Sequence, residues 1–165
     1  MRKGTTTGPS RSGADAAPEG GDQRERAWNE AVRWLALRDR SEPEVRAQLE
    51  GFSGADVDVV VARLRELRYL DDERFARGLA ERLARRGFGC ERLRHELSRH
   101  DLDHELVEAV VGVHAAGDVE RARTQLERRH RGIPSTPRER AQALRFLHGR
   151  GFSEDVVLAI MGRDW

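Results

Sequence analysis

A ten-residue pattern occurs three times, at intervals of 50 residues: GFSGADVDVV (51–60), DLDHELVEAV (101–110) and GFSEDVVLAI (151–160). In each copy an apolar residue precedes a Ser or Asp, and another apolar residue follows four positions after it. Ser and Asp cap helix starts, and apolar residues at these two positions form a hydrophobic staple. The pattern therefore predicts one helical unit that is repeated three times.

A fourth helix start follows the same rule, because Leu70 precedes Asp71 and Phe75 stands four positions after it. We interpret GFS as a structural mark rather than a reactive motif, since Gly51-Phe52-Ser53-Gly54 does not fit the G-x-S-x-G nucleophile elbow. The residues expected to act as caps or staples are Phe52, Ser53, Leu70, Asp71, Phe75, Leu102, Asp103, Phe152 and Ser153.

Each of the three GFS-like starts is preceded by a short helical segment, and that segment by a longer one. The long helices are predicted at 27–38, 72–86 and 119–131. The short segments each carry an apolar pair four residues apart: Val45 and Leu49, Leu93 and Leu97, and Ala143 and Leu147. Two capping boxes and two closing glycines support these limits: 41–44, 136–139, Gly87 and Gly132.

The fold class that follows is all-α, with three tandem three-helix repeats in an elongated, curved array. We expect the repeats at 25–68, 69–115 and 116–165. Residues 1–24 are rich in Gly, Pro, Ser and Thr and are expected to form a disordered tail. Charged residues make up 36% of the 165 and hydrophobic ones 38%, which favours thin amphipathic elements over one thick globule.

The cellular compartment is indicated by what the chain lacks. Cys90 is the single cysteine, so no intrachain disulfide can form, and this favours a reducing compartment. No apolar run is long enough for a bilayer, and the basic start is not followed by the apolar segment of a secretory signal. We expect a cytoplasmic protein without a membrane contact.

The net charge of +1 hides a strong segregation of charge. Residues 68–100 hold nine Arg against six acids, 101–120 hold six acids and no Arg, and 121–150 hold nine Arg against two acids. The Arg blocks favour a binding surface for phosphates or acidic partners, although each single Arg can instead pair with a Glu on its own helix. The acidic stretch fits a basic partner surface and neutralisation of neighbouring repeats equally well.

No catalytic or metal-binding constellation is present. Asp71-Asp72-Glu73 begins a helix, where the macrodipole favours negative charge, so these acids are expected to cap rather than to catalyse. The cysteine and histidines between 90 and 104 match no zinc spacing. Gly87-Phe88-Gly89 lacks the third glycine of a dinucleotide loop and indicates a turn between helices. We expect no enzyme activity, no cofactor and no metal.

The stretch RYLDDERFARGLAERLARRGFGCERLRHELSRHDLD (68–103) resembles the central signature of the bacterial RecX family. The matching residues are Tyr69, Leu70, Asp71, Asp72, Arg74, Phe75, Arg86, Gly87, Phe88, Gly89, Arg94, Glu96 and Leu97. The motifs Arg145-Phe146-Leu147 and Arg150-Gly151-Phe152 are similar to the family's third repeat, and 34–45 more weakly to its first. The chain departs from the family at Arg68, which is usually Gly, at Cys90, which is often Pro, and at 100–102.

This resemblance implies an elongated regulator of the recombinase RecA. Its partner would be the RecA filament on single-stranded DNA, which it would bind as a monomer, with an auxiliary contact to DNA. It would restrain filament assembly, ATP hydrolysis and strand exchange in recombination and repair. The candidates for contact with RecA or DNA are Arg77, Arg82, Arg85, Arg86, Arg92, Arg94, Arg99, Arg128, Arg129, Arg131, Arg145 and Arg150.

A second hypothesis is a helical module that binds nucleic acid independently of RecA, because its short helices could act as helix-turn-helix units.

Overall fold

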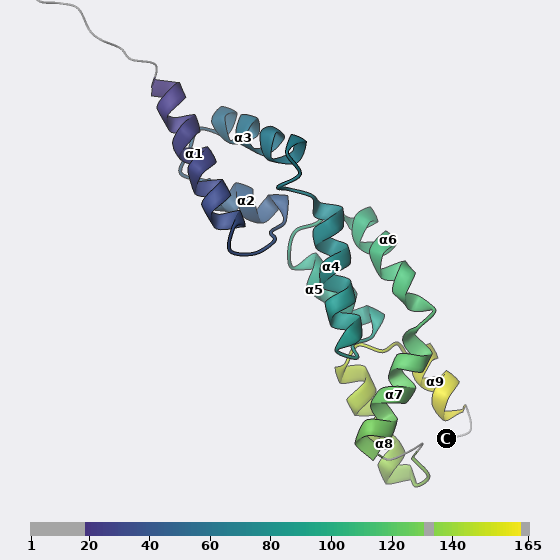
Figure 1. The fold of residues 1–165 in the computed structure, drawn as a ribbon. Helices are drawn as coiled ribbons and strands as arrows, with labels where there is room; N and C mark the ends of the chain where they lie inside the picture. Colours follow the sequence, from purple (N-terminus) through teal and green to yellow (C-terminus); the bar gives the residue numbers. More distant parts are fainter. Residues whose placement is uncertain (1–18, 131–133, 163–165) are drawn as a thin grey trace, which may run out of the picture.

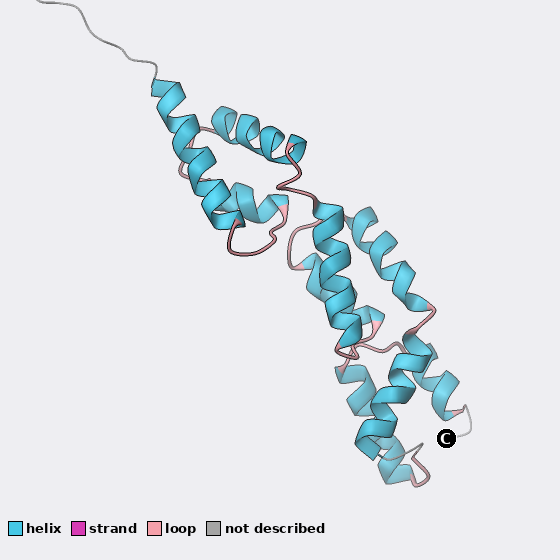
Figure 2. Ribbon diagram, viewed as in Figure 1, coloured by secondary structure: helices cyan, strands magenta, loops and turns pink. Residues whose placement is uncertain are grey.

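The computed structural model describes residues 19–130 and 134–162, and these form nine α-helices and no strand (Figures 1 and 2). The helices are α1 (Glu19–Leu35), α2 (Glu42–Gln48), α3 (Gly54–Glu66), α4 (Asp72–Arg85), α5 (Cys90–Ser98), α6 (His104–Ala115), α7 (Asp118–His130), α8 (Pro137–Gly149) and α9 (Glu154–Met161). They follow one another in three groups of three along an elongated array (Figure 1). The predicted all-α repeat architecture is confirmed.

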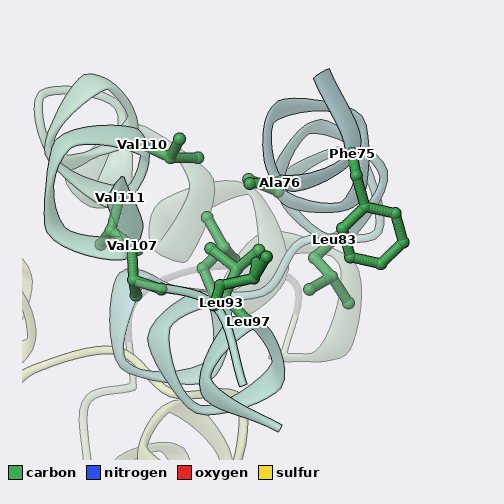
Figure 3. Packing of buried hydrophobic residues seen from close by; sticks show 10 residues of the cluster. Phe75, Ala76, Leu83, Leu93, Leu97, Val107, Val110 and Val111 are labelled. Carbon is green, nitrogen blue, oxygen red and sulfur yellow. The ribbon is translucent and has the colours of Figure 1, made fainter. Parts of the chain in front are cut away.

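Each group of three helices buries its own small hydrophobic core. The first core lies among α1–α3 around Val45, Leu49 and Leu64, and the third among α7–α9 around Leu126 and Leu147. In the second, side chains of α4, α5 and α6 point toward one another (Figure 3). Each of the three predicted apolar pairs on α2, α5 and α8 is fully buried. Three separate cores explain how a chain this rich in charge folds.

Most of the predicted helix caps form. Asp71, Asp103 and Ser153 each accept a hydrogen bond from an amide of the following first turn. Ser41 and Thr136 both complete capping boxes. Ser53 occupies the cap position of α3, but its side chain accepts no hydrogen bond, so the predicted cap bond is absent. Ser53 is exposed, and its hydroxyl is therefore not forced to bond the helix.

The staples form within three of the four starts. Phe52 packs against the core that contains Val57, and Leu102 and Phe152 lie in the cores that contain their own partners. Leu70 is different, because it is buried in the first core whereas Phe75 is buried in the second. The predicted Leu70–Phe75 staple is therefore wrong.

The turn after α3 explains the position of Leu70. Arg68 adopts a left-handed conformation with φ of 58°, which turns the chain sharply after the helix. The amides of Tyr69 and Leu70 then donate to the carbonyl of Leu64, at 2.9 and 3.2 Å. These bonds close the end of α3 and fold Leu70 back onto the first repeat. The same left-handed turn follows α4 at Gly87, where φ is 79°, as the sequence predicts.

Two further limits differ from the predicted ones. The first helix begins at Glu19 rather than at 27, so residues 19–24, assigned to the tail, are helical. The ion pairs Asp22–Arg26 within α1 and Arg24–Asp56 between α1 and α3 stabilise this added turn, and the second has an N–O distance of 3.0 Å.

The middle helix of the third repeat is not short, because α8 and α7 each have 13 residues. Gly132 lies outside the described residues.

Repeats 1 and 2 meet through polar side chains. The hydroxyl of the buried Ser41 donates to the carbonyl of His100 at 3.1 Å, and the amide of Glu42 donates to the carboxylate of Asp72 at 2.8 Å. Burial is the main cause that raises the pKa of Asp72.

Among the described helices, none is both long and apolar enough to span a bilayer.

Candidate functional site

Four of the twelve candidate arginines are held by acids of their own repeat. Arg77 pairs with Glu73 at 2.5 Å, and Arg92 and Arg99 both reach Glu96, at 2.7 and 3.5 Å. Arg94 bonds Glu108 at 2.6 Å through Nε and at 3.1 Å through Nη2. This bidentate pair raises the pKa of Arg94 and lowers that of Glu108. Intramolecular pairing is therefore a sufficient explanation for Arg94.

Four other candidates are exposed and have no hydrogen bond or ion pair within the part of the chain that the structure describes: Arg82, Arg85, Arg128 and Arg145. Arg131 lies outside the described residues. An exposed arginine without an acidic neighbour keeps its full charge and all five donors for a partner. These four side chains are the ones that the repeats' own acids do not use.

The remaining three candidates, Arg86, Arg129 and Arg150, stack together with the paired Arg92 on two phenylalanine rings. The guanidinium carbons of Arg86, Arg92 and Arg150 lie 5.5, 5.8 and 5.4 Å from the centre of the Phe88 ring. Arg150 also lies 5.1 Å from the centre of the Phe146 ring.

Arg129 stands 4.9 Å from the Phe146 ring. Arg150 thus joins the two rings, and a continuous strip runs from repeat 2 into repeat 3. We define the basic strip as Arg86, Phe88, Arg92, Arg129, Phe146 and Arg150. Arg145 extends it, because Arg129, Gln142, Arg145 and Phe146 line one open depression. Cation–π contacts within about 6 Å hold guanidinium groups in place without removing their charge.

The basic strip is positioned by direct contact between backbone segments of repeats 2 and 3. The amide of Gly89 donates to the carbonyl of Arg150, and the amide of Glu91 to the carbonyl of Gly151, both at 3.0 Å. In return the Arg150 side chain donates to the carbonyls of Arg86 and Gly87, at 3.1 and 3.4 Å. The turn that joins α4 to α5 is therefore hydrogen-bonded to the turn that follows α8.

Glycine is required where these two turns approach. A Cβ atom on Gly89 would stand 2.3 Å from the carbonyl oxygen of Gly151, and one on Gly151 would stand 2.3 Å from the amide nitrogen of Arg92. Sequence reasoning missed this contact between repeats. A signal for it was present, because the turns Arg86-Gly87-Phe88-Gly89 and Arg150-Gly151-Phe152 combine arginine, glycine and phenylalanine in the same way.

A buried acid fixes the same junction from the other side. Asp118, only 3% exposed, accepts a hydrogen bond from the amide of Cys90 at 3.0 Å and pairs with Arg121. Burial first, and then the hydrogen bond with Asp118, raises the pKa of Cys90 to about 12. The thiol is therefore protonated at neutral pH and has the inert character of a structural cysteine.

The acidic stretch 101–120 is largely used inside the chain. Asp103 caps α6, and Glu108 pairs with Arg94. Asp118 pairs with Arg121, and Glu120 lies 3.5 Å from Arg123. These ion pairs lie within repeat 2 or within repeat 3, so the acids neutralise arginines of their own repeat rather than neighbouring repeats. Neither of the two explanations that the sequence leaves open is tested by these contacts.

Asp71 and Asp72 also have structural roles, because Asp71 caps α4 and Asp72 bonds the first repeat. Across the described ranges, no three His, Cys, Asp or Glu side chains form a group that could hold a metal ion.

Two family models match the part of the chain that carries the basic strip. Residues 71–111 match the model described as RecX, second three-helix domain. Residues 117–161 match the model described as RecX, third three-helix domain. Both matches agree with the repeats observed around α4–α6 and α7–α9.

Curated relatives extend the similarity over most of the chain. The regulatory protein RecX of Herbaspirillum seropedicae is 31% identical over 137 residues, which cover 82% of this chain and 88% of that protein. The regulatory protein RecX of Cronobacter sakazakii is 32% identical over 148 residues, with coverage of 82% and 90%. The crystal structure of RecX from Lactobacillus salivarius has the same fold, with a TM-score of 0.76 and 20% identity over 86% of this chain and 96% of that chain.

Proposed function

The chain belongs to the RecX family of regulatory proteins, and from this premise we propose that it binds the RecA–DNA filament and restrains it. The restraint would act on filament assembly, ATP hydrolysis and strand exchange. A protein of this family is a regulator and not an enzyme, so its effect must come from binding. One observation carries the proposal: relatives that are 31% and 32% identical, over 88% and 90% of their own length, are named regulatory protein RecX.

The architecture supports binding to a long helical partner. Stacked three-helix repeats give length and an extended surface, which a filament can contact at several points. The basic strip and the unpaired arginines lie on repeats 2 and 3, the two repeats that the family models match. We propose that the partner is the RecA filament on single-stranded DNA, that DNA is an auxiliary contact, and that a cytoplasmic monomer is the active form.

The direct test is the DNA-dependent ATPase of RecA, measured while the protein is titrated in. Its concentration should run from below that of the filament ends up to that of RecA itself. The rate is expected to fall as the protein is added. An unchanged rate at stoichiometric amounts would contradict the proposal.

Charge reversal locates the surface. We expect Arg85→Glu/Arg86→Glu and Arg128→Glu/Arg129→Glu to weaken inhibition. The matched control is Arg33→Glu/Arg63→Glu, which makes the same change of charge at two exposed arginines of repeat 1. Equal inhibition by all three variants would place the contact elsewhere.

The second candidate function is nucleic-acid binding that does not involve RecA. The unpaired arginines of the third repeat favour this function, because exposed guanidinium groups can bind nucleic-acid phosphates without a protein partner. DNA binding together with an unaffected RecA ATPase would support this second function against the first.

A further inference from the structure

We propose that the junction of repeats 2 and 3 is a composite site for the phosphodiester backbone of single-stranded nucleic acid, a site that rests on and deepens the DNA contact of the proposed function. The basic strip is this site. It exists only while the two repeats are bonded through Gly89 and Gly151.

The strip's charges are mostly free of acidic partners. Among the described residues, Arg92 is the one of its four arginines with such a partner, Glu96. Within the same residues Arg86 and Arg129 have cation–π contacts and no ion pair, and Arg150 has cation–π contacts and hydrogen bonds to backbone carbonyls. Arg145 beside the strip has no partner at all within the described residues. Positive charge held this close together without acids is complementary to a polyanion.

The rings also fix the orientation of the guanidinium groups. A guanidinium group that lies over a phenylalanine face keeps the donors on its edge available, and those donors match phosphate oxygens in pairs. The rings of Phe88 and Phe146 are linked through Arg150, which lies 5.4 and 5.1 Å from their centres. Successive phosphates of one strand can therefore meet arginines that belong to different repeats.

The strip suits a single strand better than a duplex. Proteins that bind single strands without sequence preference combine a basic track with aromatic side chains on which bases stack. The rings of Phe88 and Phe146 already carry the guanidinium groups of Arg86, Arg129 and Arg150. Unpaired bases would therefore stack on the outer faces of these guanidinium planes, which single-strand complexes also use. A duplex keeps its bases stacked inside and would use only the charges. An acidic protein surface would not use the guanidinium faces in this way.

Neither repeat holds the strip alone. Arg86, Phe88 and Arg92 come from repeat 2, whereas Arg129, Phe146 and Arg150 come from repeat 3. Their spacing is set where the Gly89 amide meets the Arg150 carbonyl. An alanine at 89 would place its Cβ 2.3 Å from the Gly151 carbonyl oxygen, so the two repeats must separate.

The experiment measures fluorescence anisotropy of a labelled oligothymidine of about 16 nucleotides, near the upper site size of a single-strand-binding fold. Full-length protein is titrated at several salt concentrations. We expect Arg129→Gln/Arg145→Gln to bind about tenfold more weakly. The salt slope should fall by about 1.4, because each phosphate that an arginine no longer neutralises lowers it by about 0.7. The matched control, Arg33→Gln/Arg63→Gln, should bind as the unchanged protein does.

The second variant tests the composite nature of the site. Gly89→Ala should lose binding to a similar extent, whereas Gly112→Ala should not, because a Cβ at Gly112 meets nothing within 4 Å. Circular dichroism shows whether Gly89→Ala is folded. If it is unfolded, Arg86→Gln decides the matter, because it changes the part of the strip that repeat 2 contributes. A composite site predicts that Arg86→Gln weakens binding as well as Arg129→Gln/Arg145→Gln, and unchanged affinity in Arg86→Gln would overturn it.

Several results would overturn the proposal. One is unchanged oligothymidine affinity in Arg129→Gln/Arg145→Gln, and another is unchanged affinity in folded Gly89→Ala. Tighter binding of a duplex of the same sequence would refute the single-stranded assignment. If Arg129→Gln/Arg145→Gln loses RecA inhibition but still binds oligothymidine normally, the strip binds an acidic protein surface instead. RecA inhibition is measured separately, so a failure of the filament proposal is distinguishable from a failure of this one.

Discussion

The two GFS motifs are expected to respond differently to the same mutation. The Ser153 hydroxyl accepts a hydrogen bond from the amide of Val156 at 3.4 Å, whereas the Ser53 side chain accepts none. Replacing a capping serine by alanine costs about 0.5–2 kcal/mol. Because the Ser153 bond is long, we expect Ser153→Ala to lower the free energy of unfolding by about 1 kcal/mol. Ser53→Ala should change it by less than about 0.5 kcal/mol, as exposed substitutions usually do.

The assay is urea denaturation followed by circular dichroism for both variants and the unchanged protein. Because the three cores are separate, the repeats need not unfold together, and hydrogen exchange at the amides of α9 and α3 assigns each loss to its repeat. Ser153→Ala should increase exchange in α9 only, and binding by the folded protein should persist. Equal destabilisation by the two variants, or none by Ser153→Ala, would refute the assignment of the caps.

Three further changes test the core, a turn and the cysteine. Leu97 is fully buried in the second core, so Leu97→Ala should destabilise the protein by about 2–5 kcal/mol in urea denaturation; a loss below about 1 kcal/mol would contradict the packing. Arg68→Gly should stabilise it by about 0.5–1 kcal/mol, because a left-handed arginine costs about 1–2 kcal/mol and glycine loses part of that gain in chain entropy. A lowered melting temperature would count against this. Burial raises the pKa of Cys90 to about 12, so a thiol reagent should react slowly near neutral pH and faster as the pH approaches that value or when urea unfolds the chain. Fast reaction of the folded protein at neutral pH would contradict the burial.

Helix starts were predictable because their causes are local. A cap, its first-turn amide and its staple residue lie within five positions of one another, so the sequence alone locates Asp71, Asp103 and Ser153. The prediction failed at Leu70, where the preceding helix end decides rather than the following helix start. The amides of Tyr69 and Leu70 both donate to the carbonyl of Leu64, and the left-handed Arg68 makes this turn, so Leu70 folds back onto the first repeat.

The arginine site was only partly predictable, because contacts between residues far apart in the sequence decide which arginines have partners. Composition shows that repeats 2 and 3 are basic, but not which side chains have partners. Arg94 is occupied by Glu108, 14 positions away, and Arg150 bonds carbonyls 63 and 64 positions away. Such contacts depend on how the repeats stack. They separate the structural arginines from those that remain available to a partner.

The two junctions between repeats differ in kind. Repeats 2 and 3 are joined by main-chain hydrogen bonds and by the close approach of two glycines. Repeats 1 and 2 are joined by side chains, among them Ser41 with His100 and Asp72 with Glu42. A side-chain joint adjusts more easily than a close backbone contact. We therefore expect repeats 2 and 3 to dock on a partner as one body, with repeat 1 adjusting beside them.

A density map of the protein on a RecA filament with single-stranded DNA would show both the binding and the site. We expect elongated density in contact with the filament, with repeats 2 and 3 in their observed arrangement and Arg86, Arg129 and Arg145 facing the nucleic acid. Absence of the protein from the filament at saturating concentration would contradict the proposed function. A bound protein whose basic strip faces solvent would contradict the proposed site.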